Sequence, residues 1–255
     1  MRPTVAAEAC ILVTVARTSG SVPREVGAWM TVAPGGIAGT VGGGHLEFDA
    51  IARARAALAG GELAEERRYP LGPRLGQCCG GVVWLRFERI EAGEDLAARL
   101  PREPLRPLAL FGAGHVGAAI AHLARNLPLA LHWVDSREGQ FPAEPPARGW
   151  RQEVCDPPAD AVADLAPGAA VLVMSHSHAE DFDIVAACLK RRDLAFIGLI
   201  GSRTKWASFR RRLAARGLVE DDLARVVCPI GVPGVVGKQP AVIAVAVLAQ
   251  ILALP

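Results

Sequence analysis

The stretch Leu108-Ala-Leu-Phe-Gly112-Ala-Gly114-His115-Val-Gly117 decides the fold of the second half of this 255-residue chain. An apolar run of strand length leads into a Gly-x-Gly-x-x-Gly turn and then into a helical pattern, which is typical of a dinucleotide-binding unit. The first glycine allows the sharp bend, the second lets phosphates approach the backbone, and the third lets helix and strand pack closely. The start of the helix also offers N–H groups to a pyrophosphate.

A second apolar run, residues 129–135, follows the helical pattern and ends in Asp135. This acid stands about twenty residues after the glycine turn, where a carboxylate binds a ribose diol in dinucleotide-binding folds. Arg137 follows in the same loop and is an alternative contact, for a phosphate. Strand-like and helix-like segments then alternate to the end of the chain. We therefore expect a Rossmann-like domain with a mostly parallel sheet over residues 107–255.

The first part of the chain has a different pattern. Short β-rich runs at residues 9–16, 29–32, 37–41 and 82–87 surround one helical pattern over residues 46–58. These lengths predict a smaller α+β domain over residues 1–103. A proline-rich stretch over residues 101–107 marks the linker to the second domain.

The composition narrows the class of protein. Hydrophobic residues make up 51% of the chain and charged residues 21%, as in ordinary globular proteins. The net charge of +2 argues against nucleic acid or an anionic membrane as a partner. No apolar run reaches the ~18 residues of a membrane span, and the first residues lack the features of a signal peptide. With six cysteines and no sign of secretion, we expect a cytoplasmic protein with reduced thiols.

Two adjacent cysteines, Cys78 and Cys79, lie between glycines in the first domain, directly after Gln77. Neighbouring cysteines rarely form a disulfide, because the bond strains the peptide between them. Arg74 lies four residues before Cys78, and a nearby cation lowers the pKa of a thiol. A thiolate here would ligate a soft metal or attack sulfur. The alternative is a buried pair without a chemical role.

Two further segments have the residue types of binding sites. His176 and His178 follow the predicted strand 170–174, and in extended backbone they would share a face and reach one Zn²⁺. The alternative is that one histidine caps the following helix and the other lines a nucleotide pocket. Residues 42–44 (Gly-Gly-Gly), before the helix of the first domain, form either a second anion site of backbone N–H groups or a plain turn.

Eight short motifs, in order along the chain, resemble those of a known family. From about residue 10 to residue 250 the chain is similar to the xanthine dehydrogenase accessory proteins of the XdhC/CoxI type. Each motif is weak alone, and their common order makes the resemblance specific. The motifs are Arg17-Thr-Ser-Gly-Ser-Val-Pro-Arg24, Gly39-Thr-Val-Gly-Gly-Gly-His-Leu-Glu47, Leu75-Gly-Gln-Cys-Cys-Gly-Gly81, Phe111-Gly-Ala-Gly-His-Val-Gly117, Val134-Asp-Ser-Arg137, Ser175-His-Ser-His178, Gly198-Leu-Ile-Gly-Ser-Arg203 and Cys228-Pro-Ile-Gly231.

The resemblance implies a chaperone for the molybdenum cofactor. Such proteins bind the molybdopterin-type cofactor, protect it while a cysteine desulfurase supplies its sulfido ligand, and insert it into apo-xanthine dehydrogenase. By resemblance, Cys78 or Cys79, beside Gln77, contacts the metal centre, with Cys79 the favoured ligand of molybdenum. The family often carries Glu after the Pro-Ala that begins the last helix, and here Val242 stands at that position.

Three functions follow from these observations. The first is a cofactor-binding and insertion chaperone rather than a catalyst with turnover. The second is an NAD(P)-dependent oxidoreductase that would use the Rossmann-like domain, with a histidine as acid or base. The third is a thiol or metal enzyme built on the cysteine pair and the two histidines, and the lack of a second cysteine pair weakens its zinc version. An apolar pattern over residues 240–252 is compatible with a homodimer. The residues expected to bind the cofactor or a nucleotide in the second domain are Gly112, Gly114, His115, Gly117, Asp135, Arg137, His176 and His178.

Overall fold

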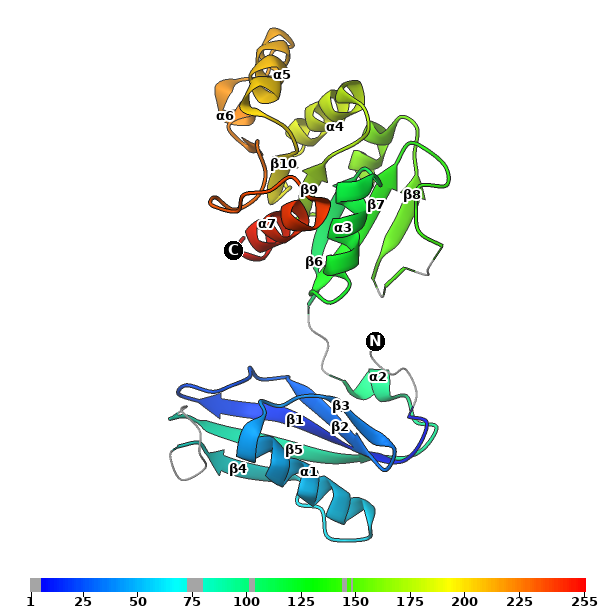
Figure 1. Cartoon of the computed structure of the whole chain (residues 1–255), viewed down its shortest axis with the longest axis vertical. Helices are drawn as coiled ribbons and strands as arrows, with labels where there is room; N and C mark the ends of the chain where they lie inside the picture. Colours follow the sequence, from blue (N-terminus) through cyan, green and yellow to red (C-terminus); the bar gives the residue numbers. More distant parts are fainter. Residues whose placement is uncertain (1–5, 73–79, 101–103, 144–145, 148) are drawn as a thin grey trace. The chain divides into compact units, whose positions relative to one another are not determined.

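The computed structural model describes residues 6–72, 80–100, 104–143, 146–147 and 149–255. The chain folds into two compact units, Met1–Glu103 and Pro104–Pro255 (Figure 1). Each unit has its own sheet and its own hydrophobic core.

The N-terminal unit is a five-stranded antiparallel sheet with the strand order β3-β2-β1-β5-β4. Side chains of the central strand alternate between two faces, as the period of a strand requires. Ile11 and Val13 pack with α1, whereas Cys10 and Leu12 pack on the other face with α2 (Figure 1). The elements are β1 (Cys10–Ser19), β2 (Trp29–Ala33), β3 (Gly36–Gly39), α1 (Gly44–Leu58), β4 (Glu66–Pro70), β5 (Val82–Ile90) and α2 (Leu96–Arg99).

The C-terminal unit is a six-stranded parallel sheet with the strand order β11-β10-β9-β6-β7-β8. Counted along the chain from β6, this is the order 3-2-1-4-5-6 of dinucleotide-binding Rossmann folds. The strands are β6 (Arg106–Phe111), β7 (Leu129–Asp135), β8 (Arg151–Val154), β9 (Ala170–Val173), β10 (Phe196–Leu199) and β11 (Val226–Val227).

Helices cover both faces of this parallel sheet. Helices α3 and α7 pack together on one face, and α4 covers the other face with a 3₁₀ turn over Pro158–Asp164 (Figure 1). Strand β9 is buried along its whole length, which explains its uninterrupted apolar sequence. The helices are α3 (His115–Ala124), α4 (His178–Lys190), α5 (Arg203–Ala215), α6 (Glu220–Leu223) and α7 (Pro240–Leu252).

The predicted fold class is confirmed: a Rossmann-like domain with a parallel sheet follows an α+β region. Two boundaries differ from the prediction. Helix α4 begins at His178, with Ser177 as its N-cap, so the second histidine lies in a helix and not in extended backbone. Strand β6 begins at Arg106, so the predicted linker ends inside a strand. Strand β11 has two residues and was not predicted, because so short a run has no readable period.

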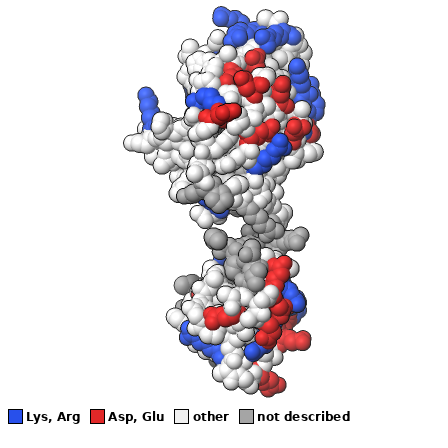
Figure 2. All heavy atoms as spheres, turned by 90° about the vertical axis from the view of Figure 1, so that its right-hand side faces the viewer, with Lys and Arg blue, Asp and Glu red and all other residues white. Residues whose placement is uncertain are grey.

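The surface and the helix lengths bear on possible partners. Within the described ranges, no helix is both long enough and apolar enough to cross a membrane. Figure 2 shows acidic and basic side chains interspersed over the visible face of each unit. Helix α7 has the most apolar sequence of the long described helices, and Val245 on it is 55% exposed. A homodimer through this helix stays a prediction.

Candidate functional site

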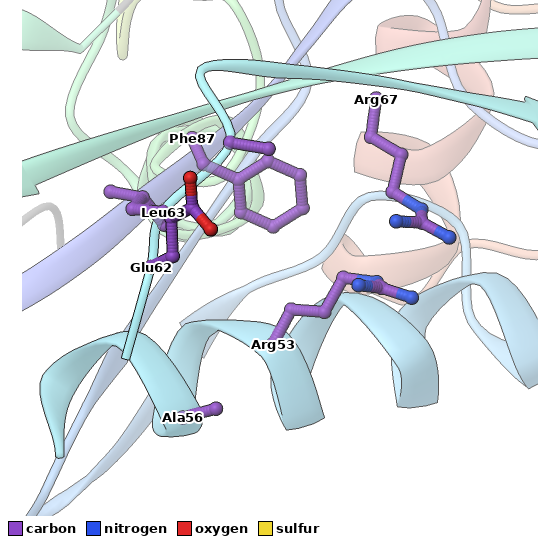
Figure 3. A pocket seen from close by; sticks show the side chains of 7 residues that line it. Arg53, Ala56, Glu62, Leu63, Arg67 and Phe87 are labelled. Atoms are coloured by element: carbon purple, nitrogen blue, oxygen red, sulfur yellow. The ribbon is translucent and has the colours of Figure 1, made fainter. Parts of the chain in front are cut away.

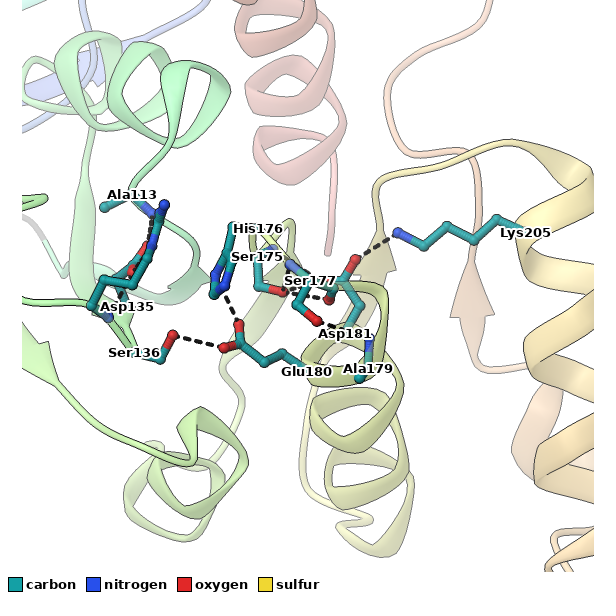
Figure 4. A network of polar contacts seen from close by, with 11 residues as sticks. Ala113, Asp135, Ser136, Ser175, His176, Ser177, Ala179, Glu180, Asp181 and Lys205 are labelled. Carbon is teal, nitrogen blue, oxygen red and sulfur yellow. Dashed lines mark hydrogen bonds and ion pairs between the residues drawn. The ribbon is translucent and has the colours of Figure 1, made fainter.

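The carboxyl ends of β6, β7 and β9 lie at one edge of the parallel sheet. Strands β6 and β9 are neighbours, but the chain leaves β6 toward β7 on one side and later enters β9 on the other. Ligands of open α/β sheets bind outside such a switch point. The three loops that follow these strands hold residues 112–114, 136–137 and 174–177, and Figure 4 shows how their side chains lie.

Two glycines of the turn after β6 are required by the fold itself. Gly112 has φ +116°, and a Cβ there would lie 2.2 Å from the carbonyl oxygen of Met174. A Cβ on Gly117 would lie 2.0 Å from the carbonyl oxygen of Gly112. The indole Nε1 of Trp133 donates to that same oxygen at 3.0 Å. Here β6, β9 and α3 approach so closely that a side chain has no space.

The middle glycine of the turn is different. Gly114 is the exposed N-cap of α3, with φ −71°, and a Cβ there would have no heavy atom within 4 Å. His115 is the first residue of α3 and is also exposed. The first N–H groups of a helix have no acceptor within the helix. Open space therefore lies in front of a helix start.

Asp135, the predicted ribose-binding acid, is 3% exposed and bonded inside the protein. Its Oδ2 accepts from the N–H of Ala113 at 2.6 Å, and its Oδ1 accepts from the N–H of Arg137 at 3.0 Å. The guanidinium of Arg137 donates to both oxygens, from Nε at 2.9 Å and from Nη2 at 3.1 Å. Burial opposes ionisation, but these bonds outweigh it and hold the pKa of Asp135 below its usual value. The acid therefore remains charged at neutral pH.

Glu180, in the first turn of α4, joins the loops after β7 and β9 (Figure 4). Its Oε1 accepts from Ser136 Oγ at 2.7 Å, and its Oε2 lies 3.4 Å from Nδ1 of His176. This Oε2 is buried and has no hydrogen-bond donor within the described residues. The His176 side chain is 43% exposed. Sequence analysis gave Glu180 no role, although its spacing of four residues from His176 was a usable signal.

A buried ion pair lies beside this network. Nζ of Lys205 donates to Oδ2 of Asp181 at 2.6 Å and to the carbonyl oxygen of Ile200 at 2.9 Å. The N–H and Oγ of Ser175 both donate to the other carboxylate oxygen of Asp181 at 2.8 Å. The Asp181 and Lys205 side chains are 1% and 11% exposed. Asp181 lies on α4 and Lys205 on α5, so only the tertiary structure brings the two charges together.

The zinc interpretation of the two histidines gains no support. His176 contacts Glu180, and His178 begins a helix instead of continuing an extended strand. Across the part of the chain that the structure describes, no group of three or more His, Cys, Asp or Glu side chains could hold a metal ion.

The glycine-rich start of α1 has its own internal anion. Glu47 is the fourth residue of α1. Its Oε2 accepts hydrogen bonds from the N–H groups of Val41 and Gly43 at 3.1 and 3.2 Å. Oγ1 of Thr40 donates to the same oxygen at 2.5 Å. The carboxylate of Glu47 therefore occupies the place of the external anion that residues 42–44 could bind.

The cysteine pair and Gln77 lie outside the described residues, within 73–79. The chain on either side is fixed, because the N–H of Leu71 donates to the carbonyl oxygen of Gly81 at 2.8 Å. This segment therefore joins the ends of β4 and β5. Among the described cysteines, Cys10 and Cys188 are buried.

A small cavity of about 120 Å³ lies elsewhere in the N-terminal unit, beside α1 (Figure 3). Arg53, Glu62, Arg67 and Phe87 are among the residues that line it. Small-molecule sites are usually about 300–1,000 Å³, so this cavity is too small to be the candidate site. None of the predicted site residues lines it.

Comparison with known proteins identifies the family. A model described as the XdhC Rossmann domain matches residues 108–251, and a model described as the XdhC and CoxI family matches residues 5–70. The chain belongs to the XdhC family. The resemblance carried by the eight motifs is thereby confirmed.

Individual relatives extend this comparison. The chain is 29% identical over 245 residues to the uncharacterized protein YqeB of Escherichia coli (strain K12). The match covers 91% of this chain and 41% of YqeB, so the chain spans about two fifths of that relative's length. A solved structure described as a xanthine dehydrogenase from Bacillus halodurans is similar over 97% of this chain and 91% of that one, with a TM-score of 0.73 and 21% identity. At 21% identity, the similarity between the two chains shows a shared fold and no more.

Proposed function

We propose that this chain is an accessory protein in the maturation of a xanthine dehydrogenase. In this proposal it binds the molybdenum cofactor, holds it while a cysteine desulfurase supplies sulfur, and passes it to the apoenzyme. The observation that carries the proposal is the match of XdhC family models to both parts of the chain, residues 5–70 and 108–251. The fold shared with a protein described as a xanthine dehydrogenase is consistent with it.

The chemistry of the cargo suits two kinds of group in the chain. The cofactor carries a phosphate and a soft metal centre, which prefer backbone N–H groups and a thiolate respectively. We assign the thiolate to Cys79, with Cys78 and Gln77 beside it. The open start of α3 at Gly114 is suited to a phosphate of the cargo or of a nucleotide. The chain then binds and transfers, and performs no turnover of its own.

The test is molybdenum retention by purified full-length variants. After incubation with molybdenum cofactor and desalting, the wild type should retain about one equivalent of metal. Cys79→Ala should lose most of it, because a thiolate is the soft ligand that the metal centre requires. Cys155→Ala is the matched control, since Cys155 is a half-buried thiol in the other unit. Metal content by mass spectrometry gives the readout.

Two results would contradict the proposal. Full retention by both Cys78→Ala and Cys79→Ala would remove the thiol assignment. Normal activation of xanthine dehydrogenase in cells that lack the chain would remove the accessory role altogether.

An NAD(P)-dependent oxidoreductase is the second candidate, favoured by the strand order of the C-terminal unit. It requires hydride transfer as well as binding. A steady loss of reduced nicotinamide absorbance with an added substrate would favour this function over the first.

A further inference from the structure

The two faces of the N-terminal sheet are covered differently. On one face, α1 packs on the apolar side chains of the strands, among them Leu85 of β5 (Figure 1). On the other face, α2 packs near Leu12, at the start of β1. Trp84 and Arg86 alternate with the buried side chains of β5 and so point to this second face, where Trp84 is half-buried and Arg86 is exposed. Around these two residues the second face is open to solvent.

Trp84 lies between two arginines on this open face. Arg17 of β1 and Arg68 of β4 are both register partners of Trp84 across the sheet. The guanidinium carbon of Arg17 lies 4.8 Å from the centroid of the Trp84 ring, and that of Arg68 lies 5.9 Å from it. A guanidinium at such a distance is attracted by the charge distribution of the ring. The three side chains therefore form a row across three neighbouring strands.

Positive charge exceeds negative charge around this row. Arg86 follows Trp84 by two residues on β5, so it lies on the same face beside the row. Glu66 is the register partner of Arg86, but its Oε1 accepts from Nη2 of Arg17 at 2.6 Å. Within the described residues, neither Arg68 nor Arg86 has an acidic partner at ion-pair distance. Three guanidiniums therefore surround one carboxylate, and this charge favours an anionic ligand.

The row also favours a ligand with a planar ring. A guanidinium that stacks on an aromatic ring keeps its second face and the N–H groups of its edge for a ligand. Planar heterocycles stack on such a face, and carboxylate or phosphate oxygens accept hydrogen bonds from the edge. Because Trp84 already restrains Arg17 and Arg68, binding costs less side-chain entropy. An anion with a planar ring makes both contacts at once, whereas inorganic phosphate makes only one.

We propose that the open face of the N-terminal sheet binds an anionic planar heterocycle through Arg17, Arg68, Trp84 and Arg86. The inference rests on the proposed function and deepens it, because the molybdenum cofactor carries a pterin ring and a phosphate. The site itself is defined by side chains of β1, β4 and β5 and uses no thiol.

The position of the row in the unit agrees with such a cargo. Arg68 stands three residues before Leu71, and Trp84 stands three residues after Gly81. The N–H of Leu71 donates to the carbonyl oxygen of Gly81, so the chain leaves β4 and enters β5 at the same level. At about 3.3 Å per residue, the row lies about 10 Å along the strands from that point. The site is therefore near the two ends of the segment to which the thiolate is assigned.

The experiment is calorimetric titration of the full chain with three probes. Pterin-6-carboxylate carries a ring and a charge, 6-methylpterin carries the ring alone, and inorganic phosphate carries the charge alone. Pterin-6-carboxylate should bind at one site and at least about tenfold more tightly than either of the others, because only this probe makes both contacts. Its affinity should fall in about 1 M salt, because the exposed guanidiniums are then screened.

Two variants test the two kinds of contact. Arg68→Gln should weaken binding of pterin-6-carboxylate about tenfold, because it removes a charged hydrogen-bond donor. Trp84→Leu should weaken it about fivefold, since the ring that restrains both guanidiniums is lost. Arg55→Gln is the matched control, because Arg55 is exposed on α1, which covers the opposite face. This control should keep the affinity of the wild type, and all three variants should keep its melting temperature.

Each outcome supports or overturns the inference. Equal binding of 6-methylpterin and pterin-6-carboxylate, full affinity in Arg68→Gln, or binding of none of the probes would overturn it. Tighter binding of a single-stranded oligonucleotide than of pterin-6-carboxylate would overturn it as well. Molybdenum retention by the wild type and by Arg68→Gln is measured in parallel. Failure of ring binding with full retention of molybdenum leaves the accessory function intact, and ring binding without retention of molybdenum leaves only this site.

Discussion

Helices α1 and α3 begin with similar sequences, but the surroundings of their N-termini differ. Both follow a strand and a glycine-rich turn, and both have a histidine in the first turn, His45 in α1 and His115 in α3. At α1 the carboxylate of Glu47 accepts from the N–H groups of the turn. At α3 the nearby acid, Asp135, accepts from Ala113, before the helix begins. The first helix start is closed by its own chain, and the second remains open.

This difference between the two helix starts shows that a glycine turn before a helix does not by itself make an anion site. Side chains in a helix lean toward its N-terminus, so an acid one turn inside can fold back onto the turn. Glu47 occupies that position after Gly43, whereas Ala118 occupies it after Gly114. Asp135 comes from a neighbouring strand and fixes the turn without covering the helix start.

The largest effect is expected for Gly112→Ala, which tests the claim that the open turn is a rigid part of the fold. The added Cβ would overlap backbone of β9 that cannot move away, at a φ that only glycine adopts readily. We expect a loss of about 3 kcal/mol of unfolding free energy. Urea denaturation of the full chain, followed by tryptophan fluorescence, gives the value. Gly114→Ala is the control, and an equal loss in both variants would disprove the distinction between the glycines.

A smaller effect is expected for Glu47→Gln, which weakens the closed helix start. Burial opposes ionisation of Glu47, but the bonds from Thr40 and from the N–H groups of residues 41–43 hold its pKa below the usual value of 4.5. Loss of the charge should cost about 1.5 kcal/mol at neutral pH, the lower end of the net value of hydrogen bonds to a charged group, because the amide oxygen of Gln still accepts.

The pH dependence provides the check on Glu47. A lowered pKa in the folded state means that the contribution is present above about pH 4.5 and is lost as the pH falls through the folded-state pKa. The stabilities of the wild type and Glu47→Gln should therefore converge in acid. Glu65→Gln should match the wild type throughout. A gap between wild type and Glu47→Gln that stays constant from pH 7 to pH 3 would count against the role of the charge.

The smallest effect on stability is expected for Ala118→Glu, which places an acid in α3 at the position that Glu47 has in α1. Ala118 is exposed, and an acid in the first turn of a helix stabilises it by about 0.3–1 kcal/mol. The new carboxylate should accept from the turn as Glu47 does, and so exclude a phosphate. We expect an unchanged or slightly raised melting temperature together with weaker nucleotide binding, measured by calorimetric titration of the full chain with NAD. Ala118→Gln, which lacks the charge, should bind more tightly than Ala118→Glu.

Much of the fold could be predicted from local pattern. The apolar runs of β6 and β7, the turn between β6 and α3 and the last helix each have a period or a glycine spacing that a short window reveals. The two-residue β11 and the early start of α4 were missed, since one has too few residues and the other depends on the cap at Ser177.

The candidate site was predicted only in part. Sequence placed Asp135, Arg137 and His176 at the sheet edge, because the ends of parallel strands share one edge. It gave no reason to pair Glu180 with Ser136 or Lys205 with Asp181, because these partners lie 44 and 24 residues apart in the chain. Spacings of that length are set by the packing of α4 and α5 against the sheet and not by any local pattern.

The sequence alone determined the family, the alternation of strands and helices in the Rossmann domain, and the three glycines of its Gly-x-Gly-x-x-Gly motif. These depend on interactions between near neighbours in the chain, which a periodic pattern or a fixed spacing records. The tertiary structure alone decided that Glu47 closes one helix start, that Asp135 is held by Ala113 and Arg137, and that Gly114 faces open space. Whether a polar group is satisfied or free depends on which distant segments pack beside it, and only the folded chain brings those segments together.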